Sequence, residues 1–120
     1  MGEPSIALVH YGGLFAAALE AVFVKAGLSF QSFNAGSTET QRQLEQAHPA
    51  VVVLNGSSER VSQVLTIRHL FRLCPDTAIL QVWPDERPIE IHRTPRSRVR
   101  HRGPLVELIR EIASLPGQAE

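Results

Sequence analysis

The chain has 120 residues, of which 43% are apolar and 20% charged, and its formal net charge is zero. This length fits one domain with a core of its own, and a neutral chain carries no nucleic-acid or membrane signal. No apolar run approaches the ~18 residues that span a bilayer, no signal-peptide pattern opens the sequence and the one cysteine, Cys74, has no partner for an intramolecular disulfide, so we expect a cytoplasmic protein.

The first half of the chain alternates between strand-like and helix-like segments. Residues 5–10, SIALVH, predict a buried strand, and residues 14–27 carry apolar side chains at helical spacing up to a terminal glycine. Residues 28–33, LSFQSF, alternate as a second strand, and a short polar helix is predicted over 37–47. The unbroken apolar run in 49–55, PAVVVLN, predicts a strand that is covered on both faces.

The second half continues the alternation and then breaks it. An amphipathic helix is predicted over 57–75 and a strand over 77–83. Three prolines in 84–102 oppose a helix longer than about two turns. A last amphipathic helix is predicted over 103–115, and residues 116–120 are expected to be a tail outside a single domain of residues 1–115.

This alternation predicts an α/β fold, in which four helices flank a mainly parallel sheet. In such sheets the functional edge lies beyond the carboxyl ends of the strands. The residues expected at that edge are His10, Tyr11, Asn55, Trp83 and either Arg93 or Arg98, whichever ends the fifth strand.

The same segments resemble a known family. The segments that carry the resemblance are, in chain order, IALVHYGGLFAAALEAVF, HPAVVVLNGSS, CPDTAILQVW and LVELIREI. They are similar, in this order, to the first, third and fourth strands and the last helix of CheY-type receiver domains, in particular the N-terminal receivers of NarL/FixJ-type response regulators. The resemblance covers residues 5–83 and 103–115. It implies a flavodoxin/CheY-like three-layer sandwich with a five-stranded, mainly parallel sheet, in which the family's fourth helix is missing or degenerate.

The departures from the family fall on its chemistry. Receivers hold Mg²⁺ with carboxylates and phosphorylate an aspartate, whereas His10 and Tyr11 stand in place of the acidic pair and Asn55 in place of the acceptor. Trp83 replaces the switch hydroxyl, and Arg98 is the substitute for the family's lysine. The resemblance therefore implies a degenerate phosphorylation pocket and a phosphorylation-independent module in two-component-like signalling, with no cofactor and no metal.

An arginine-rich segment, residues 87–102, is the second distinctive feature. It holds six of the twelve Lys and Arg residues, and its parts 89–93 and 97–101 each predict a short strand. The candidate anion-binding residues are Arg93, Arg96, Arg98, Arg100 and Arg102. Arginine favours phosphate and carboxylate, but a charged edge strand that prevents aggregation gives the same pattern. The segment has no aromatic side chains that could stack on bases, which argues against nucleic acid as its partner.

Other candidate residues have two interpretations each. Trp83 either binds a partner or fills the hollow left by the missing acidic pocket. His10 either meets His92 across the strand ends or is a partly buried structural histidine. The turn at 10–13, HYGG, could cradle a phosphate. No nucleophile–base or paired-carboxylate arrangement can be assembled from these residues, so we do not expect an enzyme.

Two functions remain open. The first is a receiver-like regulatory module that acts by protein–protein contact or dimerisation, as the N-terminal part of a transcriptional regulator. Such a module would contact DNA only through a separate domain, such as the effector domain that the family usually carries after the receiver. The second is a domain that binds a small anion or nucleotide at the carboxyl edge of the sheet. For the first, we expect a homodimer around Leu105, Leu108, Ile109 and the arginine-rich segment.

Overall fold

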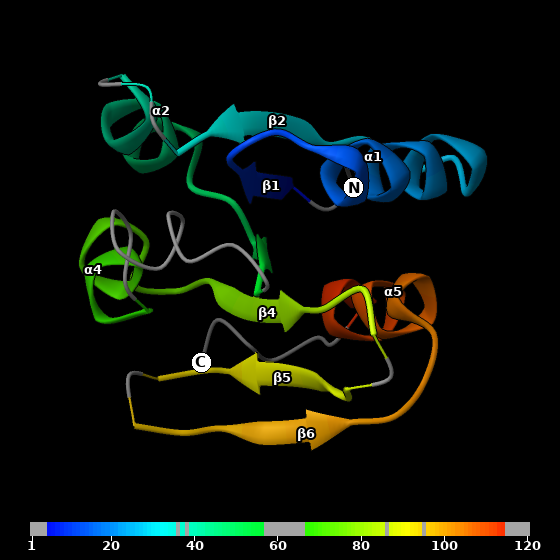
Figure 1. Cartoon of the computed structure of the whole chain (residues 1–120). Coiled ribbons are helices and arrows are strands. Elements are labelled where there is room, and N and C mark those ends of the chain that lie inside the picture. Colours follow the sequence, from blue (N-terminus) through cyan, green and yellow to red (C-terminus); the bar gives the residue numbers. More distant parts are fainter. Residues whose placement is uncertain are drawn as a thin grey trace.

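The structure is a computed structural model that describes residues 5–35, 37, 39–56, 67–85, 87–94 and 96–114. Within these residues the chain forms six strands and four helices (Figure 1). The strands are β1 (Ile6–His10), β2 (Gln31–Asn34), β3 (Val51–Asn55), β4 (Ala78–Val82), β5 (Ile89–His92) and β6 (Val99–His101). The helices are α1 (Leu14–Lys25), α2 (Thr40–Ala47), α4 (Ile67–Leu73) and α5 (Leu105–Ser114). None of the helices in this described part is both long and apolar enough to cross a membrane.

All six strands belong to one mixed sheet in the spatial order β2-β1-β3-β4-β5-β6. The first four pair in parallel, β5 runs antiparallel to β4, and β6 runs antiparallel to β5. The prediction of five mainly parallel strands is therefore wrong in the number of strands and in the direction of the fifth. The connection over residues 83–88 explains the direction, because a parallel crossover needs about a dozen residues or more.

Helices cover both faces of the sheet, as the alternating sequence predicts. Figure 1 shows α1 and α5 on one side and α2 and α4 on the other. Successive residues of a strand point to opposite faces, so Val51 and Val53 of β3 join the core under α1 and α5, while Val52 and Leu54 join the core under α2 and α4. Every residue of β3 is buried, which confirms the prediction of a strand covered on both faces.

The remaining predicted elements are confirmed in part. The second strand, Gln31–Asn34, starts three residues later than predicted, although Leu28 and Phe30 still pack against the core. The helix predicted over 57–75 is seen at Ile67–Leu73, and residues 57–66 lie outside the described part. The described residues of 84–102 contain no helix, as their prolines indicate.

A compact turn joins β5 to β6 and fixes the hairpin. The Ser97 hydroxyl accepts the backbone N–H groups of Arg93 and Thr94, at 3.1 and 3.0 Å. The Thr94 hydroxyl accepts those of Arg96 and Ser97, at 3.3 and 3.1 Å. These reciprocal side-chain bonds satisfy turn donors that would otherwise need water, as Ser and Thr do in short turns.

Helix α5 packs against the core of its own chain. Leu108 is 4% exposed and Ile109 is fully buried, and both pack in the cluster that includes Phe23 of α1 and Leu80 of β4. The expectation that Leu108 and Ile109 form a dimer interface is therefore wrong, because their apolar area is already removed from water by the fold. Leu105, at the start of the helix, also packs against this cluster.

Candidate functional site

The parallel strands β1, β3 and β4 end at one edge of the sheet, and their last residues form the candidate site. His10 ends β1, Asn55 ends β3 and Trp83 follows β4. The register places Asn55 beside Val82, the residue before Trp83. The structure thus gathers three of the predicted site residues at the carboxyl edge, where open α/β sheets bind their ligands.

His10 is fixed by hydrogen bonds on both ring nitrogens. The backbone N–H of Gly12 donates to Nδ1 at 2.8 Å, so the ring proton sits on Nε2, which lies 2.7 Å from the Ser32 hydroxyl. That hydroxyl in turn donates to Glu20 Oε2 at 2.6 Å. The chain of bonds ties β1 to β2 and α1, and it uses an N–H of the HYGG turn that a phosphate would need.

Of the two interpretations of His10, the contact with His92 is wrong. His10 ends β1, whereas His92 ends β5, with β3 and β4 between them in the sheet. Because β5 is antiparallel, its last residue also lies at the opposite edge. Tyr11 packs against the core under α2 and α4, which makes it a structural residue of the loop after β1.

Trp83 lies over the turn that follows β3. A Cβ added to Gly56 would be 2.5 Å from Cε2 of the indole, so only a glycine lets the ring lie this close to the backbone. The Gly56 N–H donates to the Val82 carbonyl at 2.6 Å, which holds the two strand ends together. Asn55, 6% exposed, is buried beneath this arrangement.

Arg87 lies over the ring of the indole. Its guanidinium carbon lies 5.3 Å from the Trp83 ring centroid, within the range of a cation–π contact. The same guanidinium forms an ion pair with Asp85, with 3.0 Å between the charged groups. The backbone N–H of Arg87 donates to Asp85 and is the main cause that lowers the pKa of that carboxyl. Arg87 is a member of the site that the sequence patterns did not single out.

The arginine-rich segment is divided between the carboxyl edge of the sheet, where β1, β3 and β4 end, and the opposite edge, where these strands begin. Arg93 and Arg96 lie in the β5–β6 turn and Arg98 follows it, at the edge opposite to Asn55. Arg98 therefore does not replace the family's lysine in the site, and the prediction that Arg93 or Arg98 joins the carboxyl edge is wrong. Arg102 follows β6, which runs in the direction of β4, and so lies at the carboxyl edge.

Within the segment, Arg98, Arg100 and Arg102 are exposed, but only Arg100 lies inside β6, so the predicted shared face holds for one arginine of the strand alone. Arg100 lies opposite Glu90 of β5 and points to the same face of the sheet. This arrangement is equally typical of a charged edge strand. The five candidate anion-binding arginines are thus not brought to one place.

A buried polar cluster on the same face, formed by His92, Gln81 and Glu90, was not identified from the sequence. His92 is 7% exposed, and its Nε2 lies 3.1 Å from Gln81 Oε1 and 3.8 Å from Glu90 Oε1. Burial lowers the pKa of His92 below its ordinary value, against the opposing effect of the Glu90 carboxylate. The alternating pattern of IEIH contained the signal, since it places both polar residues on the face opposite the isoleucines.

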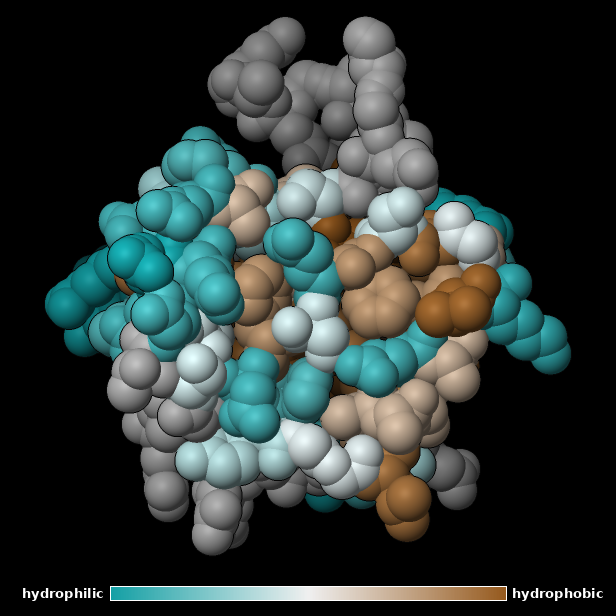
Figure 2. Space-filling model, turned by 90° about the horizontal axis from the view of Figure 1, so that it is seen from above, coloured by the Kyte–Doolittle hydropathy of each residue, from teal (hydrophilic) through white to brown (hydrophobic). Residues whose placement is uncertain are grey.

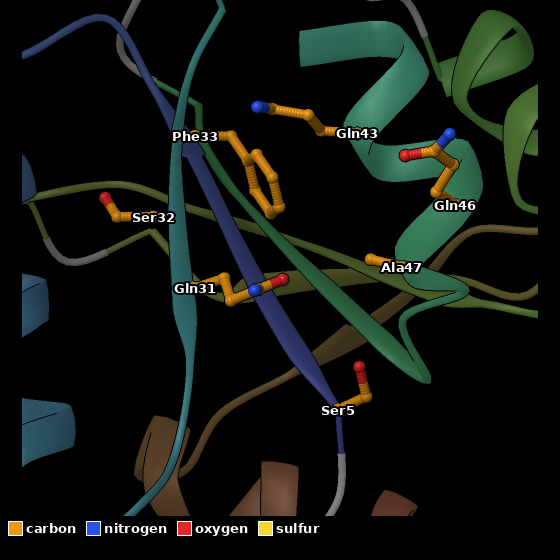
Figure 3. A pocket seen from close by; sticks show the side chains of 7 residues that line it. All are labelled: Ser5, Gln31, Ser32, Phe33, Gln43, Gln46 and Ala47. Atoms are coloured by element: carbon orange, nitrogen blue, oxygen red, sulfur yellow. The ribbon is translucent and has the colours of Figure 1, made fainter.

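Several hollows lie along the described part of the sheet, and two of them bear on the argument. A pocket of about 230 Å³ at the carboxyl edge is lined by Asp85, Arg87, Pro88, Ile89, His101, Arg102 and Gly103. An open groove of about 790 Å³ runs between β2 and α2 (Figure 3) and is lined by Ser5, Gln31, Ser32, Phe33, Gln43, Gln46 and Ala47. No three His, Cys, Asp or Glu residues among the described ones are grouped as metal ligands would be.

Comparison of the chain with protein-family models, with curated proteins and with solved structures gave no match.

Proposed function

We propose that this chain is a receiver-like signalling module that works without phosphorylation and acts by protein–protein contact, as part of a transcriptional regulator. The strand order β2-β1-β3-β4-β5 supports the proposal, because it is the order of flavodoxin-like sheets. The reversed fifth strand and the added sixth are departures from that pattern. The resemblance of residues 5–83 and 103–115 to receivers supplies the signalling context.

One observation carries the phosphorylation-independent part. The Trp83 indole lies against Gly56, directly after the position where a receiver has its acceptor aspartate. The side chain at that position, Asn55, is a buried amide, and an amide nitrogen does not attack phosphorus. Arg87 over the ring adds a second side chain beside Asn55, which supports a strand end that does not take up a phosphoryl group.

The test uses Trp83, the one tryptophan of the chain, as a built-in reporter. The protein is incubated with acetyl phosphate and Mg²⁺, and separately with beryllofluoride, while intact mass and tryptophan emission are recorded. We expect an unchanged mass and an unchanged emission spectrum, and a phosphorylatable receiver in the same reaction serves as the positive control. A phosphorylated species that maps to residues 55–58 would refute the proposal.

A second function, binding of a small anion, is favoured by the pocket beside Trp83. His101 and Arg102 line it with Arg87, although Asp85 also contributes a carboxylate. Titration of inorganic phosphate and pyrophosphate against Trp83 emission tests it. Saturable quenching that Arg102→Ala removes and Arg96→Ala, at the other edge, retains would establish this second function.

A further inference from the structure

The outer surface of α1 is unusually apolar for an exposed helix. Leu14 is 91% exposed and Val24 is 68% exposed, and Ala17 and Ala21 between them are exposed as well. The spacing of these four residues, three then four then three, is that of a helix–helix seam, so we call them the α1 seam. A seam of this kind is normally covered by a second helix.

Two hydrogen bonds show which way the α1 seam faces. Glu20 accepts the Ser32 hydroxyl at 2.6 Å, so its flank of the helix faces β2. The carbonyl of Ala26 accepts Arg110 of α5 at 2.9 Å, and Leu19 and Phe23 pack in one core cluster with residues of α5, so the other flank faces α5. At about 100° per residue, Ala17, Ala21 and Val24 follow Glu20 on the β2 flank. The seam therefore lies beside the free edge of the sheet.

That edge, although its strand is only four residues long, carries neither charges nor prolines in the part of the chain that the structure describes. β2 is the first strand of the sheet and pairs only with β1 among the described strands. The segment 26–35 contains no charged residue and no proline. The opposite edge, β6, instead carries exposed Arg98 and Arg100, which repel an added strand. The contrast marks β2 as the edge that accepts a strand.

The other flank of β2 is the groove to α2. In Figure 3, Gln31 and Phe33 point from β2 toward α2, and Gln43 extends from α2 toward β2. No charged side chain lines this groove. Amide side chains donate and accept hydrogen bonds, so a surface of glutamines is complementary to a copy of itself, whereas a surface of like charges is not.

We infer that the β2 edge, with the α1 seam on one side and the glutamine groove on the other, is the surface on which a second copy of this chain docks. Figure 2 looks onto this face and shows hydrophobic side chains over α1 and hydrophilic ones over α2. A standard interface takes ~800 Å² from each partner, so the docked copy must cover the α1 seam, the β2 edge and the glutamine groove together.

A two-fold axis perpendicular to the sheet satisfies all three parts at once. It sets the two β2 strands antiparallel. The axis must lie midway between one residue, such as Ser32, and the same residue of the partner, so that paired side chains point to the same face. The same axis sets the α1 helices antiparallel, with Leu14 beside the partner's Val24 and the small alanines at the centre. Closed two-fold dimers are the commonest soluble oligomers.

The inference deepens the proposed function. It rests on that proposal because it takes protein–protein contact as the role of the module. The two fail separately. A phosphorylated product would refute the proposed function and leave the dimer surface standing. A dimer built on another surface would overturn this inference and leave the proposed function standing.

The first experiment is light scattering over a range of micromolar concentrations on the unmodified chain and a matched pair of variants. Val24→Glu places a carboxylate in the α1 seam, and Val22→Glu makes the same change on the α5 flank, where Val22 is 44% exposed. We expect a dimer that Val24→Glu weakens at least about tenfold, because the interface would bury unpaired charge, and that Val22→Glu retains. Thermal melting of each variant confirms that both are folded.

The second experiment treats the two sheet edges alike. Gln31→Lys adds a charge to the β2 edge and Val99→Lys adds one to the β6 edge, where Val99 is 59% exposed. Only Gln31→Lys is expected to dissociate the dimer. A monomer at every concentration, or a dimer that responds to Val22→Glu or Val99→Lys instead of Val24→Glu or Gln31→Lys, would overturn the inference.

Discussion

The indole of Trp83 lies so close to the backbone of Gly56 that a single added methyl group at Gly56 would be 2.5 Å from ring atom Cε2. The two residues directly follow the neighbouring strands β3 and β4, and the Gly56 N–H to Val82 carbonyl bond keeps these strand ends in register. A large aromatic side chain is thus accommodated by the smallest residue at the edge where α/β sheets usually leave a crevice.

The first prediction concerns this contact. Gly56→Ala is expected to destabilise the fold by about 1–3 kcal/mol, because the indole must move or the turn must shift. Urea unfolding measures the loss, and the emission of Trp83 moves to longer wavelength as the ring becomes more exposed. In a Trp83→Ala background the same Gly56→Ala change should have little effect, since the obstacle is gone. Equal losses in both backgrounds would contradict the contact.

The second prediction concerns the Asn55-Gly56 pair, a sequence prone to deamidation through attack of the glycine nitrogen on the asparagine side chain. In the fold, that N–H is donated to the Val82 carbonyl at 2.6 Å, and Asn55 is buried. Deamidation at Asn55 should therefore be many-fold slower in the native protein than in urea. Peptide mapping of both samples after equal incubation measures the two rates, and similar rates would show that the turn opens readily.

The third prediction concerns pH. Burial lowers the pKa of His92 in the folded state, whereas a histidine in the unfolded chain titrates near the ordinary value of about 6.5. Above that pH both states are neutral at His92 and its contribution is complete. As pH falls below it, the unfolded chain takes up the proton first, so stability is lost until the folded pKa is reached.

Unfolding in urea at pH 7 and pH 5 tests this loss. His92→Gln is expected to flatten the pH dependence. Glu90→Gln is expected to steepen it, because it removes the carboxylate that raises the His92 pKa. A His92→Gln variant with the slope of the unmodified protein would assign the pH dependence to other groups.

The fourth prediction concerns Cys74. Its side chain is 3% exposed, its sulfur lies 3.6 Å from the Leu44 carbonyl, and burial raises the pKa of the thiol to about 11. The thiolate is the reactive form, so the native thiol should be nearly inert to a disulfide reagent at pH 8. Labelling is expected to follow global unfolding as urea is raised. Rapid labelling without denaturant would show local opening of α4 from β3.

Several elements could be predicted because their signal is local. The apolar run of β3 indicated a strand covered on both faces, and the period of α5 indicated the helix whose Leu108, Ile109 and Ile112 are buried. The two short strands of the arginine-rich segment followed from their alternation. The direction of β5 could also have been inferred, since residues 83–88 are too few for a crossover.

Among the described residues, the sequence alone therefore indicated the strands and helices to within a few residues and which side chains of an element share a face, because both depend on the 2.0 and 3.6 residue periods of the backbone. Only the tertiary structure decided which faces are covered. Periodicity made Leu108 and Ile109 as suitable for an interface as Leu14 and Val24, yet the first pair packs in the core and the second is exposed. Likewise the antiparallel hairpin, a matter of strand pairing between distant segments, carried Arg98 to one edge of the sheet and left Asn55 and Trp83 at the other.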